Sequence, residues 1–281
     1  MACRLAFNWS AALARMPRYC KRPHASNRSC ANGPMTSTSW MPLAATTAIV
    51  FSGTLVRAVS GLGFSLVAVP LLSLVWSPAQ AVAIAVLFQT LSTLPIVAGE
   101  YRLLDWRLLA RICAGGVVGM VPGLALMQWL PEPAMRVALA SILLLSIGII
   151  VAGRRLIRTM TPSRLMVVGV CAGVAQGMAG VSGPPLMAGL MAIPGLEPRQ
   201  ARLTATSVFL LLGMVSVTTL GMRGAFGVMS VSDYAIAGVG MIGGHMAGER
   251  LFALGGADGF RRYVLLVLCA SALLTLAPLW R

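Results

Sequence analysis

Long apolar segments alternate along the chain with short connections rich in glycine, proline and charge. At 1.5 Å per residue, the segments near 107–130 and 200–222 can cross a hydrocarbon layer about 30 Å thick. This pattern predicts an all-α, polytopic membrane protein. The apolar segments lie near 43–59, 61–77, 79–98, 107–130, 134–153, 165–181, 183–196, 200–222, 232–252 and 260–279.

The segment 183–196 is too short to cross such a layer as one helix. Its 14 residues reach only about 21 Å. It also begins with Gly183, Pro184 and Pro185, which cannot continue a helix cleanly. We therefore expect a half-helix or a re-entrant segment, and a broken pair of helices at this point.

The two halves of the chain share a pattern that indicates a duplication. Pro78-Ala79-Gln80-Ala81 recurs 120 residues later as Pro198-Arg199-Gln200-Ala201, and the same offset aligns Gly63 with Gly183. Further matches, at an offset of 128, are Asp105-Trp106 with Asp233-Tyr234 and Gly115-Gly116 with Gly243-Gly244. The order and spacing predict two repeats of about five helical segments. The expected organisation is a first repeat over 43–153, a basic linker over 154–164 and a second repeat over 165–279.

The number of membrane crossings decides whether the repeats are parallel or inverted. If the broken pairs 43–77 and 165–196 each cross once, there are eight crossings and parallel repeats. If every segment crosses, there are ten crossings and inverted repeats. Beyond residue 34, the first layout places eight arginines inside and six outside, and the second places eleven and three. Cytoplasmic loops are rich in arginine, but the basic residues of 1–34 reverse the preference when they are counted, so both layouts stay open. The linker 154–164, with four arginines, is cytoplasmic in either.

Composition narrows the class of protein. Hydrophobic residues make up 58% of the chain and charged residues 10%, against about 25% charged in soluble domains, which excludes a soluble enzyme. The net charge of +15 lies mostly between apolar segments, so it marks cytoplasmic loops and not a nucleic-acid partner.

Enzyme and metal motifs do not occur in the sequence. The six cysteines form no CxxC pair, and His24 and His245 are the two histidines, so neither a metal site nor a cofactor is expected. The sequence has no HExxH, no nucleophile elbow and no phosphate loop. We therefore expect a protein that is not an enzyme and that is not driven directly by ATP.

Residues 1–34 differ from the rest of the chain. They carry six basic residues, no acid and no apolar stretch of signal-peptide type. The first interpretation is a mis-assigned start, with Met35 or Met41 as the true one. A disordered basic tail and a transit peptide are the alternatives.

Three stretches resemble signatures of a known family. They are Ser60-Gly61-Leu62-Gly63-Phe64-Ser65 with Val69-Pro70-Leu71-Leu72, then Tyr101-Arg102 with Asp105-Trp106, and Gly177-Met178-Ala179-Gly180-Val181-Ser182-Gly183-Pro184-Pro185-Leu186. From about residue 45 to 279 the chain resembles the TauE/SafE sulfite exporter family. The resemblance implies a multi-pass permease for sulfite, organosulfonates or related small anions.

Glycine and proline interrupt the apolar segments at matching places in the two repeats. One interpretation is close helix packing through small residues. The other is a pair of discontinuous helices whose freed N–H groups face an anion near the midplane of the membrane. The candidate substrate-binding residues are Arg57, Gly61, Gly63, Ser65, Gln176, Ser182, Gly183 and Pro184.

Arg57 is the strongest candidate among them. An arginine at bilayer depth costs roughly 2.5–3.5 kcal/mol on insertion scales, and a guanidinium can pair with two oxygens of a sulfite or sulfonate. Gln176 holds nearly the equivalent place in the second repeat, at an offset of 119. The alternative is that Arg57 reaches an interface or caps a carbonyl.

A second set of polar residues offers weaker candidates. His245 and Glu249 are spaced i, i+4 on one helix face, and we note them as a candidate proton-coupling pair; an interfacial ion pair is the simpler interpretation. Serines and threonines within 79–98 and at the start of 200–222 either join helices or line a polar path. Arg199 and Arg202, at the mouth of that segment, are read as solvated loop charges.

Together these features predict a secondary permease in the cell (inner) membrane that moves a small anion, first of all sulfite or an organosulfonate. A carrier of another anion, such as a carboxylate, and a scaffold subunit that transports nothing are the alternatives. The expected partners are the anion and the lipid bilayer; a homo-oligomer stays open.

Overall fold

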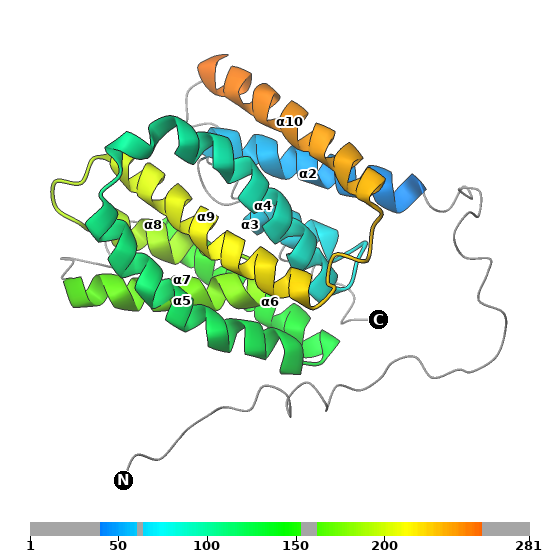
Figure 1. Ribbon diagram of the computed structural model, residues 1–281, viewed down its shortest axis with the longest axis horizontal. Coiled ribbons are helices and arrows are strands. Elements are labelled where there is room, and N and C mark those ends of the chain that lie inside the picture. Colours follow the sequence, from blue (N-terminus) through cyan, green and yellow to red (C-terminus); the bar gives the residue numbers. More distant parts are fainter. Residues whose placement is uncertain (1–39, 61–63, 153–161, 255–281) are drawn as a thin grey trace, which may run out of the picture. The chain divides into compact units, whose positions relative to one another are not determined.

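The computed structural model describes residues 40–60, 64–152 and 162–254, and this part of the chain is built from helices (Figure 1). The expected all-α class is confirmed there. The predicted extension 1–34, Gly61, Gly63, most of the linker and the last segment, 260–279, lie outside the described residues. The elements are α2 Trp40–Ser60, α3 Ser65–Leu72, α4 Pro78–Glu100, the 3-10 turn η1 Tyr101–Leu103, α5 Trp106–Trp129, α6 Glu132–Ala152, α7 Pro162–Ala179, α8 Gly183–Met191, α9 Pro198–Met222 and α10 Val231–Leu254.

Several helices begin where local chemistry favours a start. Ser77 and Gln80 form a capping box ahead of α4, with Pro78 in the first turn. The Asp105 carboxylate accepts hydrogen bonds from the first free N–H groups of α5. Such caps satisfy backbone donors that have no partner inside the helix.

Four helices of the described part are long and apolar enough to cross a membrane. They cover Trp40–Ala58, Pro78–Leu103, Trp106–Met127 and Pro198–Met222. The expected lengths of segments 107–130 and 200–222 are thereby confirmed. Helix α10 is of similar length but is not among the four, because Asp233, His245 and Glu249 interrupt its apolar sequence.

The second helix break takes the form that its glycines and prolines predict. Helix α7 ends at Ala179, and Gly180 adopts a φ of +66°, a left-handed conformation that favours glycine. Helix α8 then runs for only nine residues, from Gly183 to Met191, so a half-helix is confirmed at this place.

Closely packed helix pairs flank a central pair (Figure 1). Helices α2 and α10 lie together on one side, and α5 and α7 lie together on the other, with α4 and α9 between them. Glycine permits the close approach. A methyl group added at Gly119 would overlap the Val170 carbonyl oxygen, and one at Gly244 would overlap that of Phe51.

The directions of the helices follow from their contacts. Glu100, at the end of α4, pairs with Arg199, at the start of α9, so these two helices are antiparallel. The Trp76 indole N–H, just after α3, donates to Thr46 near the start of α2 at 3.0 Å. Helix α3 therefore runs back along α2, and the pair returns to the end from which it began.

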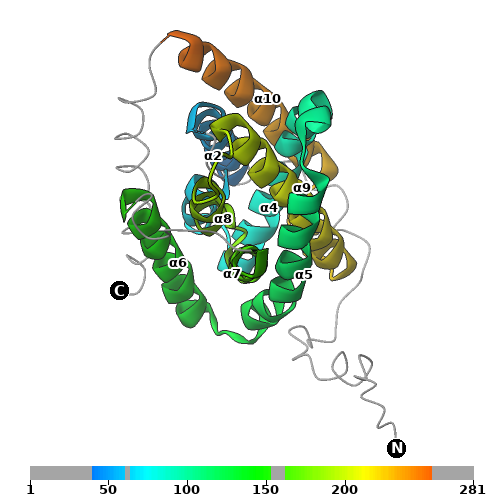
Figure 2. The ribbon, with the colours of Figure 1, turned by 90° about the vertical axis from the view of Figure 1, so that its left-hand side faces the viewer.

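Two apolar clusters are built around the two short helices, α3 and α8. Figure 2 shows α8 among α2, α4, α6 and α7. One cluster holds α3, the first half of α4 and the end of α7. The other holds α8 together with Leu104 and Leu108 of the α5 start, Leu165 of the α7 start and Ala201 of the α9 start. Helix α8 therefore returns to the end where α7 begins, as α3 returns along α2.

Candidate functional site

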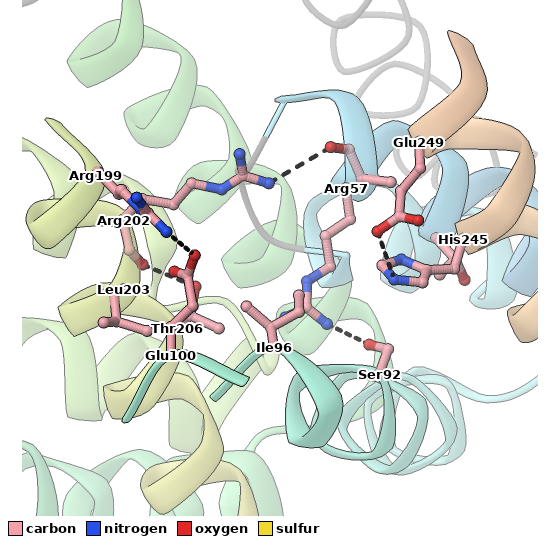
Figure 3. Close-up of a pocket in the computed structure, with 12 residues that line it drawn as sticks. Arg57, Ser92, Ile96, Glu100, Arg199, Arg202, Leu203, Thr206, His245 and Glu249 are labelled. Atoms are coloured by element: carbon pink, nitrogen blue, oxygen red, sulfur yellow. Dashed lines mark hydrogen bonds and ion pairs between the residues drawn. The ribbon is translucent and has the colours of Figure 1, made fainter. Parts of the chain in front are cut away.

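A pocket of about 330 Å³ lies between α2, α4, α9 and α10, at the end where α4 finishes and α9 begins. Figure 3 shows Arg57 at its centre, with His245 and Glu249 on one side and Arg199, Arg202 and Glu100 on the other. The lining residues are Thr54, Arg57, Ala58, Ser92, Ile96, Glu100, Arg199, Arg202, Leu203, Thr206, His245 and Glu249.

The Arg57 guanidinium is held against α4 by uncharged groups. Nη1 donates to the Gln89 carbonyl oxygen at 3.2 Å and to the Ser92 hydroxyl, and Nη2 donates to the Thr93 hydroxyl at 2.8 Å. The residue is only 5% exposed. Within the described ranges no carboxylate pairs with it. The described residues therefore provide no counter-ion for this buried charge.

The wall contributed by α10 carries a titratable pair. His245 Nε2 lies 3.2 Å from Glu249 Oε1, as their i, i+4 spacing leads one to expect. His245 is partly covered and Glu249 is largely exposed. A proton can therefore reach this pair from water at the mouth of the pocket.

The opposite wall joins α9 to α4 and α2. Arg199 Nη2 lies 2.6 Å from Glu100 Oε1, and Arg202 Nη2 lies 3.5 Å from the Ala58 carbonyl oxygen. Both arginines are exposed. Three arginines and two glutamates line the pocket. Its described walls therefore carry a net positive charge whether His245 is neutral or protonated, and they favour an anion.

The predicted site residues do not all meet at this pocket. Arg57, His245 and Glu249 line it. Ser65 is buried and donates to the Gln89 side chain. Gln176, Ser182, Gly183 and Pro184 are buried at the second break, outside the pocket lining, and the Ser182 hydroxyl donates to Gln176 Oε1 at 2.8 Å.

Some pocket residues stand outside the candidate set drawn from the sequence. The sequence pattern does not select Glu100, and it indicates solvated loop charges at Arg199 and Arg202. Each of the three stands at the end of a helix, where charged residues are common. Only the antiparallel contact of α4 with α9 brings them to Arg57. A carboxylate directly after an apolar segment, facing an arginine pair directly before another, is the signal that points to them.

The described residues contain no metal-binding cluster. Among them, no group of three histidine, cysteine, aspartate or glutamate side chains is arranged to hold a metal ion. The polar side chains that the described residues present to the pocket are guanidinium, carboxylate, hydroxyl and imidazole groups.

Comparison with known proteins agrees with this chemistry. The family described as "Sulfite exporter TauE/SafE" matches residues 45–275. A protein of Cupriavidus necator named "Probable sulfite/organosulfonate exporter TauE" is 28% identical over 180 residues, which cover 60% of this chain and 68% of that protein. No solved structure matches the chain. The chain is thus a multi-pass membrane protein that belongs to the TauE/SafE sulfite exporter family, and the transport of a small anion expected from its sequence is confirmed at that level.

Proposed function

We propose that this protein is a secondary permease that exports a small sulfur oxyanion, sulfite or an organosulfonate, across the cell membrane. One observation carries the proposal. Arg57 is a buried cation with no acidic partner in the described residues, and it fronts a pocket that is open to water. A buried charge is costly unless it is paired, so an anion from solution is the natural partner.

The substrate class follows from this donor set and from the relative. The Arg57 guanidinium is suited to an oxyanion, and the exposed Arg199 and Arg202 add positive charge. The hydroxyls of Ser92 and Thr206 already donate to the backbone carbonyl oxygens of Gln89 and Arg202. The name of the Cupriavidus necator protein gives sulfite and organosulfonates. A carboxylate offers similar oxygens and is the second candidate.

The helix directions support inverted repeats. Helices α4 and α9 stand at equivalent places in the two halves, 120 residues apart, and they run antiparallel. Parallel repeats would give these two helices the same direction. The return of α3 along α2 and of α8 along α7 also supports ten crossing or re-entrant segments instead of eight crossings.

The inverted layout also indicates to which side of the membrane the pocket opens. Its mouth lies at the end where α4 finishes and α7 begins, and in the sequence the four arginines of 154–164 lie just before α7 and in its first turn. Arginine-rich ends face the cytoplasm. We therefore place the pocket on the cytoplasmic side of the inner membrane, where an exporter collects its substrate.

A counterflow assay in proteoliposomes tests this function. Vesicles loaded with unlabelled anion should take up radiolabelled sulfite, or a taurine-like sulfonate, faster than empty vesicles. Acetate in place of both anions tests the carboxylate alternative. If none of the three anions exchanges through correctly inserted protein, the permease proposal is wrong. That result would favour the alternative of a scaffold subunit that transports nothing.

We further assign proton coupling to His245 and Glu249. A protonated imidazole carries one positive charge, so it can balance one negative charge in the pocket. The charged groups that face the pair are Arg57 from α2, Glu100 from α4, and Arg199 and Arg202 from α9.

A pH gradient separates coupling from a purely structural ion pair. A gradient across the vesicle membrane should drive anion accumulation by the natural protein and not by His245→Gln, while exchange at equal pH continues in both. Accumulation of equal extent in the two proteins contradicts the coupling role.

A further inference from the structure

A line of buried polar groups leads from the pocket to the second helix break. Arg57 Nη1 donates to the carbonyl oxygen of Gln89, and the Gln89 side chain accepts a hydrogen bond from the Ser65 hydroxyl. Gly180 lies next: a methyl group there would stand 3.7 Å from the Ser65 oxygen. Because polar groups inside a membrane protein face a cavity or one another, a series of them between the pocket and the break is the expected trace of a polar path.

Gln176 stands at the far end of this line, just before the break. Its Oε1 accepts the Ser182 hydroxyl at 2.8 Å, but its Nε2 has no hydrogen-bond partner among the residues that the structure describes. The side chain is only 1% exposed. A buried amide donor without a partner destabilises the fold and calls for an explanation.

The corresponding residue of the other half explains why this donor is left over. Gln176 follows Arg57 by 119 residues. Arg57 is satisfied by Gln89, Ser92 and Thr93 of α4. The Gln89 contact uses a backbone carbonyl, which any residue provides, whereas Ser92 and Thr93 use their hydroxyls. At 120 residues beyond these two, α9 carries Leu212 and Gly213, whose side chains offer no acceptor.

From this asymmetry we propose that Gln176 and Ser182 form a second oxyanion site, closed in the present conformation and reached from the pocket past Gln89 and Ser65. The proposal rests on the proposed function and places two successive anion-binding sites along the path. The first holds the anion by the charge of Arg57. The second holds it by neutral donors: the Gln176 amide, the Ser182 hydroxyl and the Gly183 N–H.

Neutral donors suit the release end of an export path. They bind an oxyanion more weakly than a guanidinium does, so the anion is not trapped after it leaves Arg57. The prolines at 184 and 185 have no N–H, so the α8 start contributes few backbone donors. The side chains of Gln176 and Ser182 therefore carry most of the recognition.

The test uses the paired variant Gln176→Met with Ser182→Ala, which removes both partners of one hydrogen bond together with the unpaired donor. Ser216→Ala is the matched control, because Ser216 is also buried but contacts the Met120 sulfur, away from this line. Three quantities are measured: binding of labelled sulfite to the full-length protein in detergent, counterflow in proteoliposomes, and the thermal midpoint of unfolding.

We expect the paired variant to bind sulfite with the natural affinity and to unfold at the same or a higher temperature. Its counterflow should fall about tenfold, the scale of one lost hydrogen bond to a charged group. Natural counterflow in the variant overturns the second site, as does a lower thermal midpoint accompanied by a proportional loss of binding, which marks a structural role.

The same measurements keep the two proposals apart. Arg57→Gln should lose binding itself, whereas the paired variant should lose only transport. If the natural protein neither binds nor exchanges the anion, the proposed function fails and the second site falls with it. If Arg57-dependent binding is intact and the paired variant exchanges normally, only the second site is wrong.

Discussion

At the scale of single residues, Arg57 and Gln176 stand at positions that the proposed duplication pairs, and their surroundings differ. Both are buried near the end of a broken helix, 119 residues apart. One is a cation held by hydroxyl and carbonyl oxygens, and the other is an amide whose nitrogen finds no partner among the described residues. The sequence predicted both positions from their place next to glycine breaks, but their different partners depend on which residues α4 and α9 present to them.

Gly180 provides a prediction for the helix break itself. Its φ of +66° is unfavourable for other residues, and a methyl group would stand 2.7 Å from the Val86 Cγ2 atom. We expect Gly180→Ala to lower the free energy of unfolding by about 1–3 kcal/mol, from strain and overpacking together. Thermal unfolding of the purified protein in detergent measures this change.

Gly195→Ala is the control for that variant. Gly195 also has a positive φ, of +78°, but nothing lies within 4 Å of the added methyl group. It should therefore show the backbone strain alone. Equal losses in the two variants would mean that contact with Val86 does not matter.

At the scale of elements, the sequence predicts the helices better than their pairing. Caps at Ser77 and Asp105 and the break at Gly180 are local features, so they can be read from neighbouring residues. The pairing of α5 with α7 joins segments that local patterns do not connect.

The helix pairing also suggests a different register for the proposed repeat. Gly119 approaches Val170 and Gly244 approaches Phe51. Val170 and Phe51 are 119 residues apart, like Gln176 and Arg57, but Gly244 follows Gly119 by 125 residues and not by the 128 that the aspartate and glycine matches indicate. A shift of three residues keeps nearly the same helix face, which is why the sequence alone does not detect it.

The contact between α5 and α7 gives the second prediction. A methyl group at Gly119 would overlap the backbone of Val170, so Gly119→Ala should force the helices apart and lower the free energy of unfolding by about 1–3 kcal/mol. Gly148 of α6 has nothing within 4 Å of an added methyl group. Gly148→Ala should leave the thermal midpoint equal or slightly higher, and a loss as large as that of Gly119→Ala would contradict the packing argument.

At the scale of the whole molecule, the sequence established the class, and the helix directions favour one of its two layouts. The arginine count alone could not choose, because the basic residues of 1–34 reverse it. The direction of α9 relative to α4 comes only from long-range contacts such as Glu100 with Arg199. The pocket, which needs four helices, was equally beyond local patterns.

Cysteine labelling tests the inverted layout. In a protein whose six native cysteines are replaced, Gly227→Cys between α9 and α10 should react with an impermeant maleimide in intact cells. Thr161→Cys, in the linker region, should react only after lysis. The parallel layout places both on the cytoplasmic side, so protection of Gly227→Cys in intact cells would overturn the inverted layout.

The central claim, that Arg57 is the charge that recognises the transported anion, is tested most directly by counterflow with Arg57→Gln. Arg223→Gln is the control, since Arg223 is exposed at the end of α9 and does not line the pocket. Initial rates of sulfite exchange are measured over a range of concentrations in proteoliposomes with equal amounts of inserted protein. We predict that Arg57→Gln raises the half-saturating concentration about tenfold to hundredfold, as expected for the loss of a charged hydrogen bond, while Arg223→Gln exchanges like the natural protein. Exchange by Arg57→Gln with natural affinity and rate would contradict the claim.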